Sequence, residues 1–145
     1  MKKLLVFLTL ATAACLFSCL SNDEKSSSGV IRMPINPNGD TELALLMRDM
    51  FEDGMKVKSQ IQNGEKPTIL VDFENIHTAE ATEPEKAASP EFKAYALAYS
   101  QAVKTLKECE QAQAKEAYSN MVGVCMSCHE AMCPGPIVRI KKMML

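Results

Sequence analysis

The feature that most constrains this chain is a run of five residues close to the end of the sequence, Cys125-Met126-Ser127-Cys128-His129. The two cysteines and the histidine stand at positions i, i+3 and i+4. On an α-helix, residues at this spacing lie on one face, so both thiols and the imidazole project in the same direction. The run therefore predicts a helix that presents two sulfur atoms and one nitrogen atom to a single flat ligand.

A Cys-x-x-Cys-His motif is the attachment site of c-type haem. Each thiol adds to one vinyl group of the porphyrin, and the histidine that follows can reach the iron along the axis perpendicular to the ring. We therefore predict that Cys125 and Cys128 hold one covalent haem c per chain, and that His129 is an axial ligand of its iron. Residues 125–129 are called the haem motif below.

Two other interpretations of the haem motif stay open. A closed zinc site needs four ligands, and the remaining candidates, His77, Cys109 and Cys133, form no second close pair. A thioredoxin-like redox pair normally opens a helix after a strand, whereas this pair lies deep inside a helical pattern. A non-haem metal protein or a structural lipoprotein is therefore a weaker alternative to a haem protein.

The N-terminal segment predicts export from the cytoplasm. Lys2 and Lys3 precede the apolar run 4–17, which is too short for a permanent membrane helix and has the length of a secretory signal. Bacterial haem attachment takes place outside the cytoplasm, so the export signal and the haem motif support each other. We predict a lipoprotein signal peptide over residues 1–18.

The end of this signal resembles a bacterial lipobox, in which a small residue precedes the cysteine that is acylated. Ser18 precedes Cys19, which is the predicted acylation site, and Cys15 is a weaker alternative. An ordinary cleaved signal is the other possibility. Acylation would tether the protein to a membrane surface, so the expected location is the cell envelope.

Beyond the signal, composition divides the chain into a tether and a single domain. Residues 19–39 are rich in Ser, Asn, Pro and Gly and are predicted to be flexible, and residues 40–145 are long enough for one core. Residues 1–18 hold two lysines and no acid, so the rest of the chain is more acidic than the whole, whose net charge is −2. With no basic tract, nucleic acid is not an expected partner.

Three apolar stripes of helical period predict an all-α domain. The first helix is expected to begin at Asp40 as its N-cap and to end at Gly64, and the second to begin after Ser89 with Pro90 in its first turn. The third is expected over about residues 114–132. The stripes consist of Leu43, Met47, Met50, Gly54, Val57 and Ile61; of Phe92, Tyr95, Tyr99, Val103 and Leu106; and of Ala114, Tyr118, Met121, Cys125, Cys128 and Met132.

The connections between these helices are less regular. Residues 65–88 form a poor helical pattern, and the short apolar run within 68–73 could be extended. The turn between the second and third helices is expected between about residues 107 and 113. If the third helix is unbroken, Cys109 and Cys133 are separated by about 25–30 Å, which is beyond the reach of a disulfide.

With the haem motif on its last long helix, the chain resembles the class II c-type cytochromes, the cytochrome c′ family and its low-spin relatives. The resemblance covers the layout of about residues 40–133, but only the haem motif is specific. It implies an antiparallel helical bundle and, as in many relatives, a homodimer. Family bundles have four helices, so the second helix is expected to be short or missing here.

The resemblance also implies residues for the other side of the haem. In the family the first helix supplies the distal side chain, which is Met in low-spin electron carriers and a non-ligating apolar residue in many five-coordinate members. We prefer Met47 as the distal ligand, with Met50 and His77 as alternatives; both methionines could instead be core residues, and His77 a surface residue. Arg48 occupies the place of an arginine that the family often sets near a haem propionate.

Two functions are compatible with these features, and neither is enzymatic, because no catalytic arrangement of side chains is recognisable. The favoured one is one-electron transfer at the cell envelope, with other redox proteins as partners and the membrane as anchor through the lipid. The alternative is a five-coordinate haem protein that binds small ligands such as NO or CO.

Overall fold

The computed structural model describes residues 39–145, and within this range the protein is all-α and contains no β-strand. The predicted signal peptide 1–18, the predicted acylation site Cys19 and all but the last residue of the predicted tether 19–39 lie outside the described residues. None of the helices in the described part of the chain is long and apolar enough to cross a membrane.

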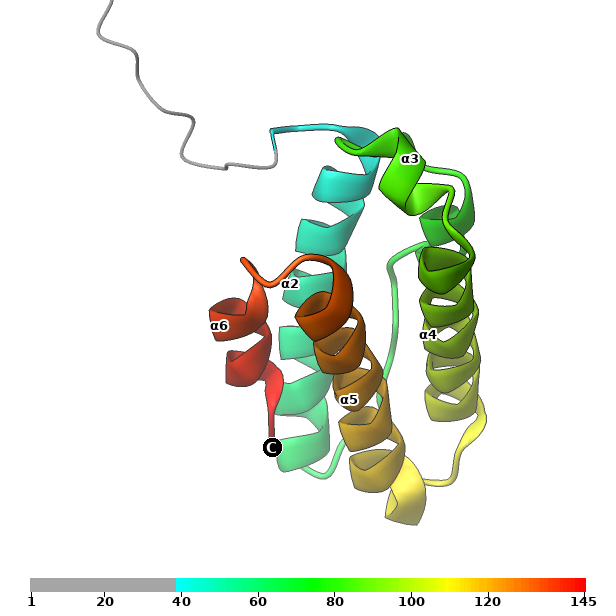
Figure 1. Ribbon diagram of the computed structural model, residues 1–145. Helices are drawn as coiled ribbons and strands as arrows, with labels where there is room; N and C mark the ends of the chain where they lie inside the picture. The colour runs from blue at the N-terminus through cyan, green and yellow to red at the C-terminus, as the bar shows by residue number, and fades with distance from the viewer. Residues whose placement is uncertain (1–38) are drawn as a thin grey trace, which may run out of the picture. The chain divides into compact units, whose positions relative to one another are not determined.

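Three long helices form the frame of the domain: α2 (Glu42–Gln62), α4 (Pro90–Glu108) and α5 (Ala114–Met132). α2 and α4 run in the same direction, and α5 runs in the opposite direction (Figure 1). The predicted helices are thus all present, and their bounds lie close to the predicted ones.

The ends of the helices follow from local chemistry at a few positions. The Ser89 hydroxyl accepts a hydrogen bond of 3.1 Å from the Phe92 N–H, and Pro90 occupies the first turn of α4, as predicted. Gly64 follows α2 with a φ of +74°, a conformation that favours glycine. The predicted cap at Asp40 is wrong, because Thr41 is the N-cap and Asp40 pairs with the Arg48 side chain instead.

Short helices fill the connections between and beyond the long ones. No long helix lies between α2 and α4, which agrees with the expected short or missing second helix. The short elements are η1 (Phe73–His77), α3 (Pro84–Ala87), η2 (Gln111–Gln113), α6 (Ile137–Ile140) and η3 (Lys141–Met143).

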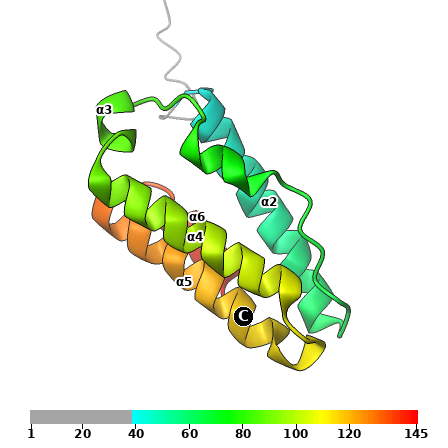
Figure 2. The same ribbon diagram turned by 90° about the vertical axis from the view of Figure 1, so that its right-hand side faces the viewer.

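Residues 65–83 return along α2 as a largely irregular segment (Figure 2). Main-chain N–H groups that are taken out of water need hydrogen-bond partners, and here side chains on the surface of α2 supply them. The pairs, donor first, are Thr68 to Gln60 (2.9 Å), Leu70 and Val71 to Asp53 (3.0 and 3.3 Å) and Glu80 to Glu42 (3.1 Å). Three side chains of α2 therefore satisfy main-chain N–H groups of this return segment, which forms no long helix of its own.

Tyr118 on α5 is the largest fully buried side chain in the core between the long helices. Its hydroxyl lies 3.0 Å from the carbonyl oxygens of both Gly54 and Met143, so one side chain connects α5 with α2 and with η3. Residues 137–145, called the terminal arm below, are held further by the Lys58 ammonium, which donates to the carbonyl oxygens of Lys142 and Met144. The terminal arm therefore packs back onto α2.

Candidate haem site

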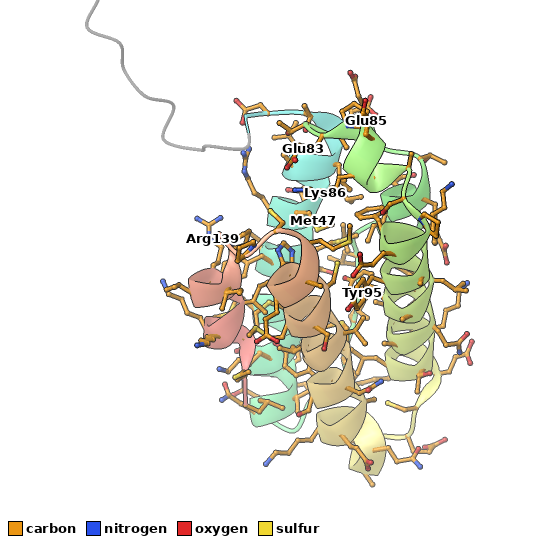
Figure 3. The ribbon with its side chains drawn as sticks, viewed as in Figure 1. Met47, Glu83, Glu85, Lys86, Tyr95 and Arg139 are labelled. Carbon is orange, nitrogen blue, oxygen red and sulfur yellow. The ribbon has the colours of Figure 1, made fainter. Side chains whose placement is uncertain are left out.

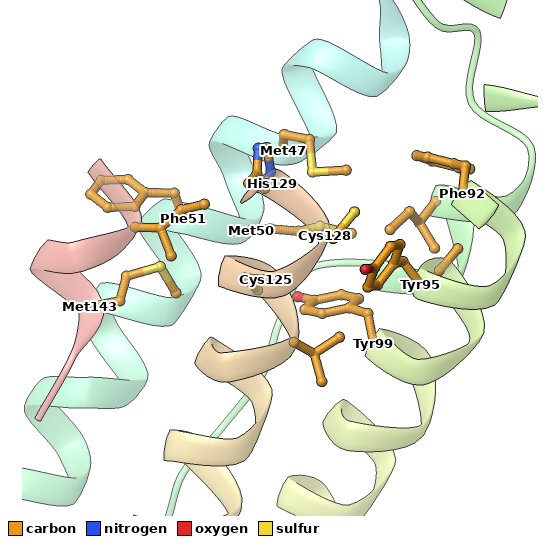
Figure 4. Close-up of a pocket in the computed structure, with 14 residues that line it drawn as sticks. Met47, Met50, Phe51, Phe92, Tyr95, Tyr99, Cys125, Cys128, His129 and Met143 are labelled. Atoms are coloured by element: carbon orange, nitrogen blue, oxygen red, sulfur yellow. The ribbon is translucent and has the colours of Figure 1, made fainter. Parts of the chain in front are cut away.

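The haem motif lies in the second half of α5, and Cys125, Cys128 and His129 line one cavity (Figure 4). This inner cavity contains about 570 Å³ of space without atoms, part of it open to solvent. Its other lining residues are Met47, Met50, Phe51, Ile76, Phe92, Tyr95, Ala96, Tyr99, Val124, Ile140 and Met143. Since no lysine, arginine, aspartate or glutamate is among them, the inner cavity suits an apolar ring such as a porphyrin.

The inner cavity opens into a larger outer groove of about 1840 Å³, a volume that includes open solvent. Both are lined by six residues, Met47, Phe51, Phe92, Cys128, His129 and Ile140. The outer groove adds charged side chains from α2, α3 and the terminal arm, which are Arg48, Glu83, Lys86, Arg139 and Lys142. The two spaces together form one recess with an apolar inner end and a charged outer end.

The imidazole of His129 is held in a defined orientation. Its Nδ1 lies 2.9 Å from the carbonyl oxygen of Cys133, the residue that follows the end of α5. A carbonyl oxygen can only accept a hydrogen bond, so Nδ1 carries a hydrogen, and in the neutral imidazole the lone pair is then on Nε2. Metal-binding histidines are typically oriented by such a bond from their second nitrogen. His129 is therefore prepared to bind a metal through Nε2.

The two thiols of the haem motif are protonated in this environment. Burial raises the pKa of Cys125 to about 12, with a smaller contribution from neighbouring Cys128, although the thiol keeps some contact with the cavity. Burial also raises the pKa of Cys128. A thioredoxin-like pair needs a lowered thiol pKa at the start of a helix, so the structure disfavours that interpretation.

The zinc interpretation also gains no support. Within residues 39–145, no group of three or more His, Cys, Asp or Glu side chains is arranged to hold a metal ion. Cys109 and Cys133 lie beyond the two ends of the unbroken α5, whose 19 residues span about 28 Å at 1.5 Å per residue. A disulfide between them is excluded in this fold.

Both methionines predicted for the distal side line the inner cavity. Met50 is 8% exposed and belongs to the core, whereas half-buried Met47 lines the inner cavity and the outer groove. Both come from α2, opposite the haem motif on α5 (Figure 4). The structure thus brings the thioethers of both methionines to the cavity.

His77 lines neither the inner cavity nor the outer groove. Its Nε2 lies 3.0 Å from the hydroxyl of Ser100 and 3.6 Å from a carboxylate oxygen of Glu74, so it connects η1 with α4. The structure does not bring this alternative ligand to the haem motif. Ser100 is only 2% exposed, which also argues against a nucleophilic role for this Ser–His contact.

Arg48 does line the outer groove, but its guanidinium already has partners. One nitrogen lies 2.6 Å from a carboxylate oxygen of Asp40, and the other donates to the carbonyl oxygen of Gly39. This arginine therefore holds the chain that enters α2. Its predicted contact with a propionate would compete with the Asp40 pair.

Several lining residues were not predicted as part of the site. Tyr95 and Tyr99 were expected only as stripe residues, yet both rings face the inner cavity from α4 (Figure 4). Burial raises the pKa of Tyr99 far above its usual range, so its hydroxyl stays protonated. Ile140 and Met143 come from the terminal arm, whose alternation of basic and apolar residues suggests a packing arm but does not indicate which helix it packs against.

The site is therefore defined by an uncharged cavity, two neutral thiols and one oriented imidazole, all on elements that the core holds in place. The haem motif itself spans little more than one turn of α5. Comparison of the chain with models of protein families, with curated proteins and with solved structures found no match.

Proposed function

We propose that the protein is a c-type cytochrome that carries one haem through Cys125 and Cys128, with His129 as an axial ligand, and that it transfers single electrons at the cell envelope. The observation that carries this proposal is that both thiols and the oriented imidazole line one uncharged cavity. When bound, the haem supplies an iron that gains or loses one electron.

The protein's own residues would hold and shield this group. The apolar walls from α2, α4 and the terminal arm would keep water away from the ring, which limits the rearrangement that accompanies a change of charge. The bond from His129 to the Cys133 carbonyl would fix the proximal ligand. A thioether from Met47, or alternatively from Met50, would complete the coordination and raise the reduction potential.

The helix arrangement supports an antiparallel bundle of the cytochrome c′ type. In an up-down-up-down bundle, the first and third helices are parallel and the fourth is opposite to both. α2, α4 and α5 have these directions, and residues 65–83 return where the second helix would run (Figures 1 and 2). The haem motif then lies on the last long helix, as it does in that family.

The proposal includes a lipid anchor at Cys19 and a position at the cell envelope. Its partners would be other redox proteins that donate or accept the electron, and a homodimer is expected from the resemblance to class II cytochromes. Mass measurement of the exported protein would test the anchor, because acylation and cleavage change the mass at the new N-terminus.

A second candidate function is the binding of NO or CO by a five-coordinate iron. The observation that favours it is the packing of Met50 among core side chains, with Phe51, Ile140 and Met143 also lining the cavity. A methionine used for packing leaves the distal position open to a small apolar ligand. Under this alternative, Met47 and Met50 would both be lining residues.

The visible spectrum of the full chain, produced in a host that matures c-type cytochromes, distinguishes these functions. We expect haem that stays attached after acidic organic extraction, low-spin bands and a weak far-red band from a methionine–iron bond. High-spin bands that shift when CO is added would support the second candidate. Protein without covalent haem would contradict both.

A further inference from the structure

The polarity of the recess predicts how a haem would be oriented in it. All charged lining residues belong to the outer groove, and none belongs to the inner cavity. A buried charge is costly unless water or an opposite charge is near. Since haem combines an apolar ring with two carboxylates, a haem attached to the haem motif would keep its ring in the inner cavity and its carboxylates in the outer groove.

Two of the cations in the outer groove are already neutralised by acids of the protein. Arg48 pairs with Asp40, as described above, and the Lys86 ammonium lies 2.8 Å from the carboxylate of Glu83. The hydrogen bond with Glu83 raises the pKa of Lys86. Neither cation could bind a further carboxylate without sharing or losing its present partner.

The other two cations that line the outer groove are Arg139 and Lys142, and of these two only Arg139 also contacts an aromatic ring of the recess. Within residues 39–145, no carboxylate lies within ion-pair distance of its guanidinium, which instead covers the ring of Phe51 at 5.3 Å. Phe51 lines both the inner cavity and the outer groove. This cation–π contact therefore places the guanidinium at the boundary between the apolar and the charged parts of the recess.

The elements that carry these residues surround the opening of the recess. Figure 3 shows Arg139 on α6 and Lys86 on α3, with Met47 of α2 between them in this view. A guanidinium has a planar set of donors that matches the two oxygens of a carboxylate. Arg139 thus has both the position and the chemistry for a carboxylate.

We infer that Arg139 binds a carboxylate of the haem, so that the terminal arm, and not the first helix, supplies the propionate contact. The inference rests on the proposed function and adds a residue to it. It also gives the terminal arm a role beyond packing, because Arg139 contributes a charge where Ile140 and Met143 contribute apolar wall.

The test is the pH dependence of the reduction potential of the haem-loaded full chain. A nearby guanidinium lowers the pKa of a carboxylate by one unit or more. For Arg139→Gln we expect the pH range over which the potential falls to move up by about one unit, and the potential at neutral pH to decrease, because a positive charge near the iron is lost. Arg139→Lys keeps the charge but loses the planar donors, so we expect a smaller shift in the same direction.

Lys141→Gln is the matched control, because it removes the same charge from the terminal arm at a residue that does not line the recess. It should leave the pH profile unchanged. An unchanged profile in Arg139→Gln, or the shift appearing in Arg48→Gln instead, would overturn the inference. If Arg139→Gln yields too little protein, Arg139→Lys takes its place, and an unchanged pH profile of its reduction potential would overturn the inference. The absence of covalent haem from the unsubstituted chain is a separate outcome that contradicts the proposed function itself.

Discussion

The two halves of α5 show how one helix can be used for two purposes. In its first half, Tyr118, Met121 and Val122 are almost fully buried, and Tyr118 bonds to carbonyl oxygens of two other elements. In its second half, Cys125, Cys128 and His129 stay half-buried around an open cavity. The first half shows close packing where the fold is stabilised, and the second shows space kept open where a ligand is expected.

The sharpest way to separate the halves is to remove the thiols. The double substitution Cys125→Ala and Cys128→Ala should abolish covalent haem attachment completely, because neither thiol of the haem motif remains to add to a vinyl group. The unloaded protein should still fold, since neither side chain belongs to the fully buried core. Mass and spectrum after acidic organic extraction measure the loss.

Cys109→Ala is the control for this experiment, because Cys109 lies beyond α4 and lines neither the inner cavity nor the outer groove. It should retain the full amount of covalent haem. Covalent haem in the double variant would mean that the haem motif is not the attachment site.

Shortening a side chain that packs against the first half of α5 should lower the free energy of unfolding, whereas shortening an exposed side chain should not. Leu106 is fully buried on α4 opposite the first half of α5, so Leu106→Ala should lower the free energy of unfolding by about 2–5 kcal/mol. Leu97 lies on the same helix and is 66% exposed, so Leu97→Ala should change it by about 0.5 kcal/mol or less. Urea unfolding of both variants measures the difference, and equal losses would contradict the comparison.

The two distal methionines should have modest effects on stability and different effects on the spectrum. Met47→Leu and Met50→Leu conserve volume, so each should cost less than about 1.5 kcal/mol in the free energy of unfolding. In the haem-loaded protein, only the variant that removes the true ligand should lose the far-red methionine band. We expect Met47→Leu to lose this band. If Met50→Leu loses it instead, Met50 is the ligand and our assignment is wrong.

The smallest effect concerns a surface pair far from the haem motif. Lys104 lies 2.8 Å from the Glu74 carboxylate and lowers its pKa chiefly through their hydrogen bond. A lowered folded-state pKa adds stability above the unfolded pKa of Glu, and this contribution disappears as the pH falls through the folded value. Lys104→Gln should therefore be slightly less stable than the unsubstituted protein near neutral pH and equally stable near pH 3.

Thermal unfolding at several pH values measures this difference, and Lys93→Gln, on the exposed side of the same helix, is the control. A difference between Lys104→Gln and the unsubstituted protein that persists in acid would show that another interaction of Lys104 is responsible. Absorbance should also show that Lys104→Gln carries as much haem as the unsubstituted protein, because neither Lys104 nor Glu74 lies in the haem motif.

Much of the fold could be predicted because its signals act within one helical turn. The Ser89 cap, the proline at position 90 and the positive φ of Gly64 each depend on residues at most three positions away. The same is true of the haem motif, whose spacing alone places three ligating groups on one face of a helix. Local chemistry of this kind is read directly from the sequence.

The parts that could not be predicted depend on contacts between distant residues. Asp53 belongs to none of the predicted stripes, yet it is buried and binds the return segment through the N–H groups of Leu70 and Val71. The position of the terminal arm depends on Tyr118, and nothing in the local sequence indicates that pairing. The cap assigned to Asp40 failed for a similar reason, because the Arg48 side chain, two turns away, binds its carboxylate.

The end of α5 gives the candidate haem site a property that the length of the helix alone does not suggest. Pro134 and Pro136 stop the helix, and the Cys133 carbonyl, which a longer helix would use for its own backbone bonds, accepts the His129 Nδ1–H instead. A histidine that donates to a carbonyl becomes more electron-rich at its other nitrogen. Under the proposed function, the prolines that end α5 thus also control how strongly the protein pushes electron density toward the iron.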